Sequence, residues 1–158
     1  MEIDGRELRN ALGQFTTGVC LITAVTDAGE ALALTANSFT SVSLEPPLVL
    51  WSLQNNSEVF SVFAGAKQFA INVLAGKQQD LSSRYARKGD HGLEAGEFTI
   101  GEYGVPLVND ALASFECSLE ATHPGGDHVI IVGRVEALHQ RSEGEPLVFF
   151  SGAYRALA

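Results

Sequence analysis

Residues 31–53 read "ALALTANSFTSVSLEPPLVLWSL", in which two apolar runs flank a segment of small hydrogen-bonding side chains. Both runs have strand length. Pro46 and Pro47 stand at the start of the second run, where a missing backbone N–H group is tolerated. Together with the upstream run "GVCLITAVT" and the turn "DAGE", the first run predicts a β-hairpin. This part of the chain therefore indicates antiparallel β structure.

The rest of the chain continues as short apolar runs separated by glycine, proline and polar residues. Further strands are expected over "QFAINVLA", "ASFECSLEATH", "DHVIIVGRVEALH" and "PLVFFSGAYRA", which makes about seven strands, mostly in sequence-adjacent antiparallel pairs. The glycine-rich, acidic stretch from Gly89 to Gly104 is expected to be a loop. Because few helices are available to cover an open sheet, we expect an antiparallel barrel, which removes exposed edges.

The segment "DGRELRNALGQF" predicts a short N-terminal helix. Asp4 stands three residues before Glu7, which is a capping-box pattern. Leu8, Leu12 and Phe15 recur at helical spacing, so they lie on one face. Two more short helices are expected over "EVFSVFAGAK" and "KQQDLSSRYARK".

The composition is that of a globular chain. At 158 residues it has the length of one ordinary domain, so we expect a single domain over residues 1–158. Apolar residues make up 46% and charged residues 18%, and no apolar run approaches the ~20 residues needed to cross a bilayer. The N-terminus "MEIDGRELRN" lacks the pattern of a secretion signal, so the cytoplasm is the expected location.

The formal net charge of −9 argues against nucleic acid or an anionic membrane as a partner. Nevertheless, four of the ten basic residues fall within twelve positions: Lys77, Arg84, Arg87 and Lys88. This cluster could hold a phosphate, or it could be the solvated face of a helix. On charge alone both interpretations stay open.

The two cysteines, Cys20 and Cys117, lie in apolar strand-like segments without CxxC spacing, which predicts buried thiols in preference to a disulfide or a metal pair. A metal held by His123 and His128 would need further ligands. The nearest candidate is the lone thiol of Cys117, so no metal site is predicted.

Five segments resemble the short-chain flavin reductases that serve two-component flavin-dependent monooxygenases: "FTTGVCLITA", "LTANSFTSVSLEPPLVLWSL", "FAINVLAGKQQDLSSRYA", "FECSLEATHPGGDHVIIVGRV" and "PLVFFSGAY". They occur in the family's order and at about its spacing. The resemblance implies a split β-barrel of Greek-key type that binds FMN or FAD. It also implies reduction of flavin by NADH or NADPH at a homodimer interface, and release of reduced flavin to a separate monooxygenase.

The resemblance places the flavin ring against Thr35, Ala36, Asn37 and Ser38. Isoalloxazine is flat and largely neutral, so short uncharged donors and acceptors suit its edge. In an extended strand Thr35 and Asn37 share one face and Ala36 and Ser38 the other, so not all can touch one ligand. Asn37 and Ser38 are favoured as ligands, and Ala36 matters because its small side chain lets the backbone approach. The alternative is a hydroxyl-rich strand with one solvated face.

Two further segments match positions at which family members contact the ribityl chain and phosphate. The first places Ser52 and Leu53 at a strand end and Asn56 and Ser57 at a helix start. Ser57 could instead simply cap that helix, and the two roles can coexist.

The second segment, "LSSRYA", contributes Ser82, Ser83 and Arg84. Arg84 is the favoured basic residue because its planar guanidinium suits phosphate oxygens. Tyr85 replaces the family's more usual phenylalanine.

The turn "HPGGDH" at residues 123–128 ends with His128 at a strand entrance. By itself a histidine at a turn is mostly a surface residue, but the family's Gly-Asp-His pattern places this histidine beside the nicotinamide. Strand alternation directs Asp127 to the opposite face, so Asp127 is a poor candidate to orient the imidazole. Tyr154 is a second candidate for the nicotinamide side, or a buried aromatic that closes the barrel.

The implied reaction needs no protein nucleophile, because the hydride passes from nicotinamide C4 to flavin N5 and both atoms belong to cofactors. No GxGxxG motif is present, so no Rossmann domain is expected. Two alternatives stay open. One is a flavoenzyme on the same barrel that retains its flavin and acts on an organic substrate; the other is a non-catalytic module that binds flavin or haem.

Overall fold

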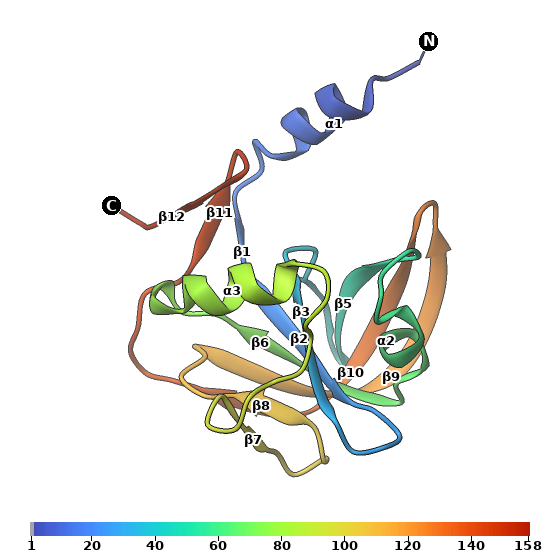
Figure 1. The fold of residues 1–158 in the computed structure, drawn as a ribbon, viewed down its shortest axis with the longest axis vertical. Coiled ribbons are helices and arrows are strands. Elements are labelled where there is room, and N and C mark those ends of the chain that lie inside the picture. The colour runs from blue at the N-terminus through green and yellow to red at the C-terminus, as the bar shows by residue number, and fades with distance from the viewer. Residues whose placement is uncertain (1) are drawn as a thin grey trace.

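The computed structural model describes residues 2–158, and its centre is a seven-stranded antiparallel sheet with the order β3-β2-β6-β9-β10-β5-β4 (Figure 1). Its strands are β2 (Cys20–Val25), β3 (Ala31–Ala36), β4 (Thr40–Leu44), β5 (Pro47–Gln54), β6 (Gln68–Val73), β9 (Ala113–Gly125) and β10 (His128–Gln140). The hairpin predicted from the run "GVCLITAVT" and the apolar run that begins at Ala31 forms as β2 and β3, with Cys20 opposite Ala36. The predicted antiparallel β architecture is confirmed.

Two smaller sheets complete the β structure. One has the order β1-β11-β12, formed by β1 (Thr17–Gly18), β11 (Val148–Phe150) and β12 (Ala153–Arg155). The other pairs β7 (Phe98–Ile100) with β8 (Pro106–Val108). Two predictions were therefore incomplete: the run "PLVFFSGAYRA" folds as a hairpin rather than one strand, and the expected loop from Gly89 to Gly104 contains β7.

The helices are α1 (Gly5–Leu12), α2 (Phe60–Gly65) and α3 (Gln79–Ala86), with the 3-10 turn η1 (Gly76–Gln78) before α3. Helix α1 forms as predicted, but the Asp4 side chain makes no capping hydrogen bond. Helix α2 begins at Phe60 rather than at Ser57. The Ser57 hydroxyl instead accepts the Val59 N–H at 3.3 Å, within a turn that precedes the helix.

The apolar face of α1 has no partner within the described chain. Leu8 is 48% exposed and Leu12 65%, and no residue of α1 is buried; Phe15, just after the helix, is 79% exposed. Figure 1 shows α1 extending away from the barrel. The helix therefore presents an apolar stripe to its surroundings.

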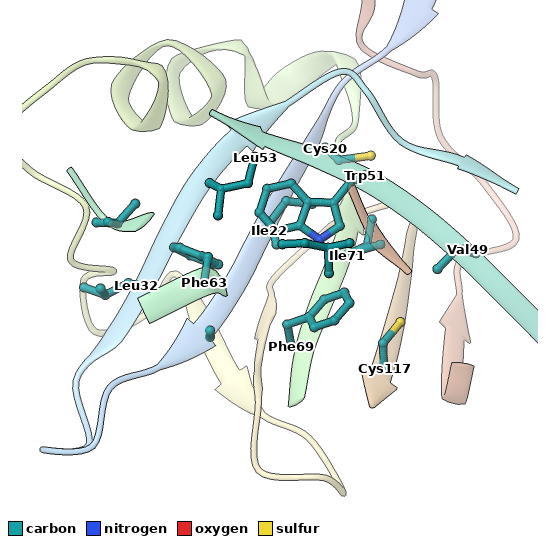
Figure 2. Close-up of a cluster of buried hydrophobic side chains, with 13 residues drawn as sticks. Cys20, Ile22, Leu32, Val49, Trp51, Leu53, Phe63, Phe69, Ile71 and Cys117 are labelled. Atoms are coloured by element: carbon teal, nitrogen blue, oxygen red, sulfur yellow. The ribbon is translucent and has the colours of Figure 1, made fainter. Parts of the chain in front are cut away.

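The main core lies inside the sheet and is centred on Trp51 (Figure 2). The Trp51 ring meets Phe63 and Phe69 edge-on, with centroids 6.0 and 6.4 Å away. Gly133 makes room for this cluster, since a Cβ there would lie 2.7 Å from the Phe69 ring. The absence of a side chain at position 133 thus lets Phe69 lie against β10.

Both cysteines are free thiols buried in the first core cluster, as predicted. Burial raises the pKa of each thiol to about 12, and for Cys117 the charges of Glu136 and Glu116 add to the effect. Neither thiol is therefore ionised near neutral pH, and we assign them no chemistry.

A second core cluster joins α3 to the sheet through Leu21, Leu74, Tyr85 and Leu147. Beside it, the fully buried side chain of Asn72 uses both its donor and its acceptor. Its amide nitrogen donates to Leu21 O and Thr23 Oγ1, each at 3.0 Å. Its amide oxygen accepts from Val108 N–H at 3.0 Å and from Ser114 Oγ at 2.7 Å. One side chain thus connects β2, β6, β8 and β9.

A buried carboxylate, Glu116, lies on β9 and is fully shielded from solvent. It accepts hydrogen bonds from His139 Nε2 at 2.8 Å and from Tyr103 N–H at 2.9 Å. Gly101 packs directly against it, because a Cβ at that position would collide with the carboxylate. The contacts of Glu116 with Tyr103 and Gly101 hold the turn between β7 and β8 against the main sheet.

The outer edge of β3 is covered by residues 91–93. Ala33 N–H donates to His91 O at 2.8 Å, and Leu93 N–H donates to Ala31 O at 2.9 Å. An isolated bridge pairs Leu32 with Gly92. This segment of the expected loop therefore continues the sheet beyond β3 without forming a regular strand.

None of the helices in residues 2–158 has the length and apolar character needed to cross a membrane.

Candidate active site

A cavity of about 230 Å³ lies where β3, β5, the start of β10 and the end of α3 meet. It is lined by Leu34, Thr35, Ala36, Ser38, Ser52, Leu53, Gln54, Ser57, Ala86 and His128. Seven of the predicted site residues are in this set. The cavity is smaller than the ~300–1,000 Å³ of typical ligand pockets, so one chain does not enclose a large cofactor.

A larger hollow of about 810 Å³ lies elsewhere, against the turn after β2 and the residues around α2. It contains none of the predicted site residues and lies away from the His128 turn. The volume of this hollow alone does not indicate an active site. The smaller cavity, which gathers hydroxyl groups and an imidazole from distant parts of the chain, is the better candidate.

The segment predicted to contact the flavin ring is bent, not continuously extended. Strand β3 ends at Ala36 and β4 begins at Thr40. The bend is held by Ser38, whose hydroxyl accepts the Ser52 N–H at 2.9 Å and contacts Ser52 O at 3.3 Å. The assumption that one extended strand runs from Thr35 through Ser38 was therefore wrong.

Because of this bend, Asn37 does not line the candidate cavity. It is exposed and lines another hollow of about 290 Å³, together with Phe15, Thr17 and Phe39. The two ligands favoured from sequence, Asn37 and Ser38, thus face different spaces. The prediction that both contact one ring is not supported within a single chain.

Strand β5 supplies the opposite wall through Ser52, Leu53 and Gln54. The sequence analysis missed Gln54, although it follows Ser52 by two positions and shares its strand face. Asn56 is exposed and does not line the cavity. Leu34 and Ala86 were also missed, because neither side chain carries a hydrogen-bonding group that sequence patterns could single out.

On α3, Ser82 is fully buried and bonds to Tyr154, with their hydroxyl oxygens 2.6 Å apart. Thr35 Oγ1 donates to Ser82 O at 2.7 Å. The Tyr154 ring packs edge-on against Phe149. The hydroxyl groups of Ser82 and Tyr154 are therefore hydrogen-bonded to each other. Neither residue lines the cavity, and Ser83 does not line it.

Arg84 is held by three carboxylates rather than facing the cavity. It pairs with Asp90 and Glu94 at 3.1 Å and with Glu97 at 3.3 Å. Its guanidinium holds the pKa of Asp90 below the ordinary value of that carboxyl. These ion pairs give the predicted phosphate contact of Arg84 no support. They attach the loop after α3 to the helix.

Tyr85 also attaches the loop after α3 to the helix. Its ring is buried, and its hydroxyl donates to Glu97 at 2.7 Å and lies 3.1 Å from Gly92 O. Burial, together with Glu97, raises the pKa of this phenol. The hydroxyl that distinguishes Tyr85 from the family's usual phenylalanine thus has a structural role.

His128 lines the cavity at the start of β10, and its Nδ1 lies 2.7 Å from Asp127 Oδ1. The prediction that Asp127 is a poor candidate to orient this imidazole was wrong. Asp127 precedes the strand, so the alternation of strand side chains does not apply to it. The contact holds the pKa of Asp127 below its ordinary value. With Nδ1 engaged, Nε2 remains available to a ligand.

The hairpin turn that carries His128 is tied to the end of β5. Asn55 N–H donates to Asp127 O at 2.9 Å, and the Asn55 side chain donates to Gly126 O at 3.2 Å. Gly126 has a φ of 69°, a conformation that favours glycine. These bonds place His128 opposite Gln54 in the sheet register.

Comparison with known proteins relates this arrangement to a family. The model described as flavin reductase like domain matches residues 12–158. The chain belongs to the flavin reductase-like family. The resemblance inferred from the five sequence segments is thereby confirmed.

Individual flavin reductase-like proteins match over nearly the whole chain. This chain is 47% identical over 152 residues to FMN reductase (NADH) SmoA of Agrobacterium fabrum, and the match covers 96% of this chain and 85% of SmoA. It is 37% identical over 155 residues to HsaB of Rhodococcus jostii, the reductase subunit of a flavin-dependent monooxygenase, covering 98% and 79%. The solved structure of NADH:FAD oxidoreductase SgcE6 from Streptomyces globisporus, with NAD and FAD fragments, superposes with a TM-score of 0.91 at 32% identity, covering 100% and 97%. The predicted split-barrel fold is confirmed.

In this flavin reductase-like chain the described residues that line the cavity are uncharged apart from the ionisable imidazole of His128. Hydroxyl groups, a carboxamide and small apolar side chains can hold a flat, neutral ring through its edge and faces. The lining contains neither a carboxylate pair nor a nucleophile with an adjacent base. The site is therefore suited to positioning reactive cofactors.

Proposed function

We propose that this protein is an NADH-dependent flavin reductase that reduces FMN or FAD and supplies the reduced flavin to a separate flavin-dependent monooxygenase. The observation that carries the proposal is the cavity of neutral hydrogen-bonding groups with His128 in its lining. The family relationship supports the same conclusion.

The names of two relatives support NADH as the reductant. SmoA is named an FMN reductase that uses NADH, and SgcE6 is named an NADH:FAD oxidoreductase. They agree on the nucleotide and differ on the flavin. We therefore propose NADH in preference to NADPH, with FMN and FAD both as candidate substrates.

The residues that line the cavity fit a flavin. Ala36 has a small side chain that lets a ring edge approach the backbone, and the hydroxyls of Ser52 and Ser57 can donate or accept. When bound together, flavin and NADH supply the hydride transfer between their own rings. His128, held through Nδ1 by Asp127, orients the nicotinamide through Nε2. The contribution of the protein is thus to position the flavin and the nicotinamide relative to each other.

For the flavin phosphate we propose Arg87 and Lys88 in place of Arg84. They are the two residues after Ala86, which lines the cavity. Both are exposed, and neither has an ion-pair partner in the described part of the chain. Arg84, by contrast, is already neutralised by its three carboxylates.

Anaerobic mixing of the purified protein with FMN or FAD and with NADH or NADPH, followed at the flavin absorbance band, tests the proposal. We expect catalytic bleaching of a molar excess of free flavin by NADH. Bleaching limited to one protein equivalent, with flavin that stays bound through gel filtration, would support a flavin-retaining enzyme. Flavin binding without any bleaching would support a non-catalytic module.

Replacing His128 with alanine should slow flavin reduction by NADH while leaving the affinity for oxidised flavin nearly unchanged. One neutral hydrogen bond is lost, so a reduction in efficiency of a few-fold to about tenfold is expected. Stopped-flow reduction at saturating flavin, with affinity from fluorescence quenching, measures both quantities. His123→Ala is the matched control, since His123 is exposed on the same hairpin and does not line the cavity. Loss of flavin binding with normal reduction of bound flavin would place His128 in the flavin pocket instead.

A homodimer remains part of the proposal, and the exposed stripe of α1 supports it. The cavity of one chain is too small to enclose a flavin, and the stripe offers apolar surface for a second copy.

Replacing Leu12 with glutamate should therefore weaken dimerisation about tenfold or more, because a charge enters an apolar contact. Sedimentation velocity over a concentration series measures this shift. Ile100→Glu makes the same change at an exposed position on β7 and should leave the dimer intact. A wild-type monomer with full reductase activity at the same concentration would refute the dimer.

A further inference from the structure

Gln54 is the last residue of β5 and lines the candidate cavity together with His128. The two residues lie directly opposite each other where β5 pairs with β10. Opposite residues of antiparallel strands project to the same face of the sheet, with Cβ atoms ~4.5–5.5 Å apart. The cavity lining therefore holds a carboxamide and an imidazole side by side.

The alternation of β5 directs Gln54 to this face of the sheet. Trp51 and Leu53 are buried in the core, whereas Ser52 is partly buried and Gln54 is exposed. Ser52 and Gln54 thus share the outer face of the strand, and both line the cavity. The Gln54 side chain is available to a ligand that enters there.

The Gln54 carboxamide has no hydrogen-bond partner within residues 2–158, whereas the polar side chains next to it are engaged. The Asn55 side chain donates to Gly126 O at 3.2 Å. His128 Nδ1 lies 2.7 Å from Asp127 Oδ1. An exposed carboxamide is solvated through its N–H groups and its oxygen, so a ligand replaces this water without loss when it offers both a donor and an acceptor.

The nicotinamide ring offers such a group, since its one polar substituent is a carboxamide. Two carboxamides can form a reciprocal pair, in which each donates an N–H to the oxygen of the other. The flavin edge also has an N–H beside a carbonyl, so the position of Gln54 decides between the two rings. Gln54 is paired with His128, which the proposed function places on the nicotinamide. The predicted flavin contacts at residues 35–38 come instead from β3 and the bend that follows it.

We propose that Gln54 is a specificity-determining residue for the nicotinamide ring, whose carboxamide it pairs with and selects over a carboxylate. The inference rests on the proposed function and adds a second side chain to His128 on the nicotinamide side. A nicotinate carboxylate has no N–H, so it can only accept from Gln54 and forms one half of the reciprocal pair.

Isothermal titration calorimetry on the oxidised protein saturated with FMN tests this inference. The two ligands are NAD⁺ and nicotinic acid adenine dinucleotide, in which a carboxylate replaces the carboxamide. Neither reduces flavin, so the measurement does not depend on turnover. The quantity compared between variants is the ratio of the affinity for NAD⁺ to that for the nicotinate analogue, because contacts with the shared adenosine and phosphates cancel in it.

The two Gln54 variants should shift this ratio in opposite directions. Gln54→Leu removes the hydrogen bonds at similar size, so it should lower the affinity for NAD⁺ about three- to tenfold and lower the ratio. Gln54→Glu still accepts the N–H of a carboxamide but repels a carboxylate, so it should raise the ratio about fivefold or more above wild type. The concentration dependence of flavin reduction by the two reduced nucleotides gives the same ratio during turnover.

Gln140→Leu is the matched control, because Gln140 is an exposed glutamine at the far end of β10 and does not line the cavity. It should keep the wild-type ratio, and thermal melting establishes that each variant is folded. An unchanged ratio in both Gln54 variants would overturn the inference. A loss of FMN affinity with an unchanged ratio would also overturn it and place Gln54 against the flavin. In both cases flavin reduction by the wild-type protein and NADH would leave the proposed function intact, whereas a wild-type protein that reduces no flavin with NADH would end both.

Discussion

Asn72→Ala should lower the free energy of unfolding by about 3 kcal/mol, because it leaves several buried polar groups without partners. The Asn72 side chain bonds to Leu21, Thr23, Val108 and Ser114, and it is fully buried. For a chain of this length the midpoint of thermal unfolding should fall by roughly 6–12 °C. Urea unfolding followed by circular dichroism measures the change directly.

Two further variants sharpen this test. Asn72→Asp keeps the size and the acceptor oxygen but removes the amide donor to Leu21 and Thr23, so it should also destabilise. Asn56→Ala, at an exposed turn position, should change stability by less than about 0.5 kcal/mol. Equal stability of Asn72→Ala and the wild-type protein would mean that the four bonds contribute nothing net to folding.

His139→Ala should destabilise the protein by about 2–3 kcal/mol, because it leaves the buried Glu116 carboxylate with the Tyr103 N–H as its remaining partner. Urea unfolding followed by circular dichroism measures the loss.

A double-mutant cycle separates the charge from the packing. Adding Glu116→Gln to His139→Ala replaces the unpaired carboxylate with a neutral amide of similar size, and should recover part of the lost stability at neutral pH. A deficit that Glu116→Gln does not reduce would show that His139 acts through packing alone.

Most of the fold could be predicted because its signals are local. The β2–β3 hairpin, the strand that begins at the two prolines and the helical spacing of α1 each depend on residues close in sequence. The bend at residues 37–39 could not be predicted in this way. It depends on hydrogen bonds between Ser38 and Ser52, which lie fourteen positions apart.

Among the predicted site residues, Thr35, Ser52 and His128 lie on strands and line the cavity, and their roles stay predictions. Other predicted residues do not line it, because another part of the chain bonds the same side chain. Arg84 looked like a phosphate ligand because three acidic residues in the following loop were not known to fold back onto it. Asp127 was dismissed because the exact start of β10, and so the limit of strand alternation, is not visible in the sequence.

The two ends of the main sheet bear on how easily strands of other molecules can add to it. A free strand edge can recruit strands from other molecules and begin an aggregate. At one end residues 91–93 already occupy the hydrogen-bonding groups of β3. At the other end β4 carries a register shift between Ser41 and Ser43, an irregularity that spoils the template for an incoming strand. Aggregation by strand addition is thus discouraged at both ends, by an irregular segment on one and a bulge on the other.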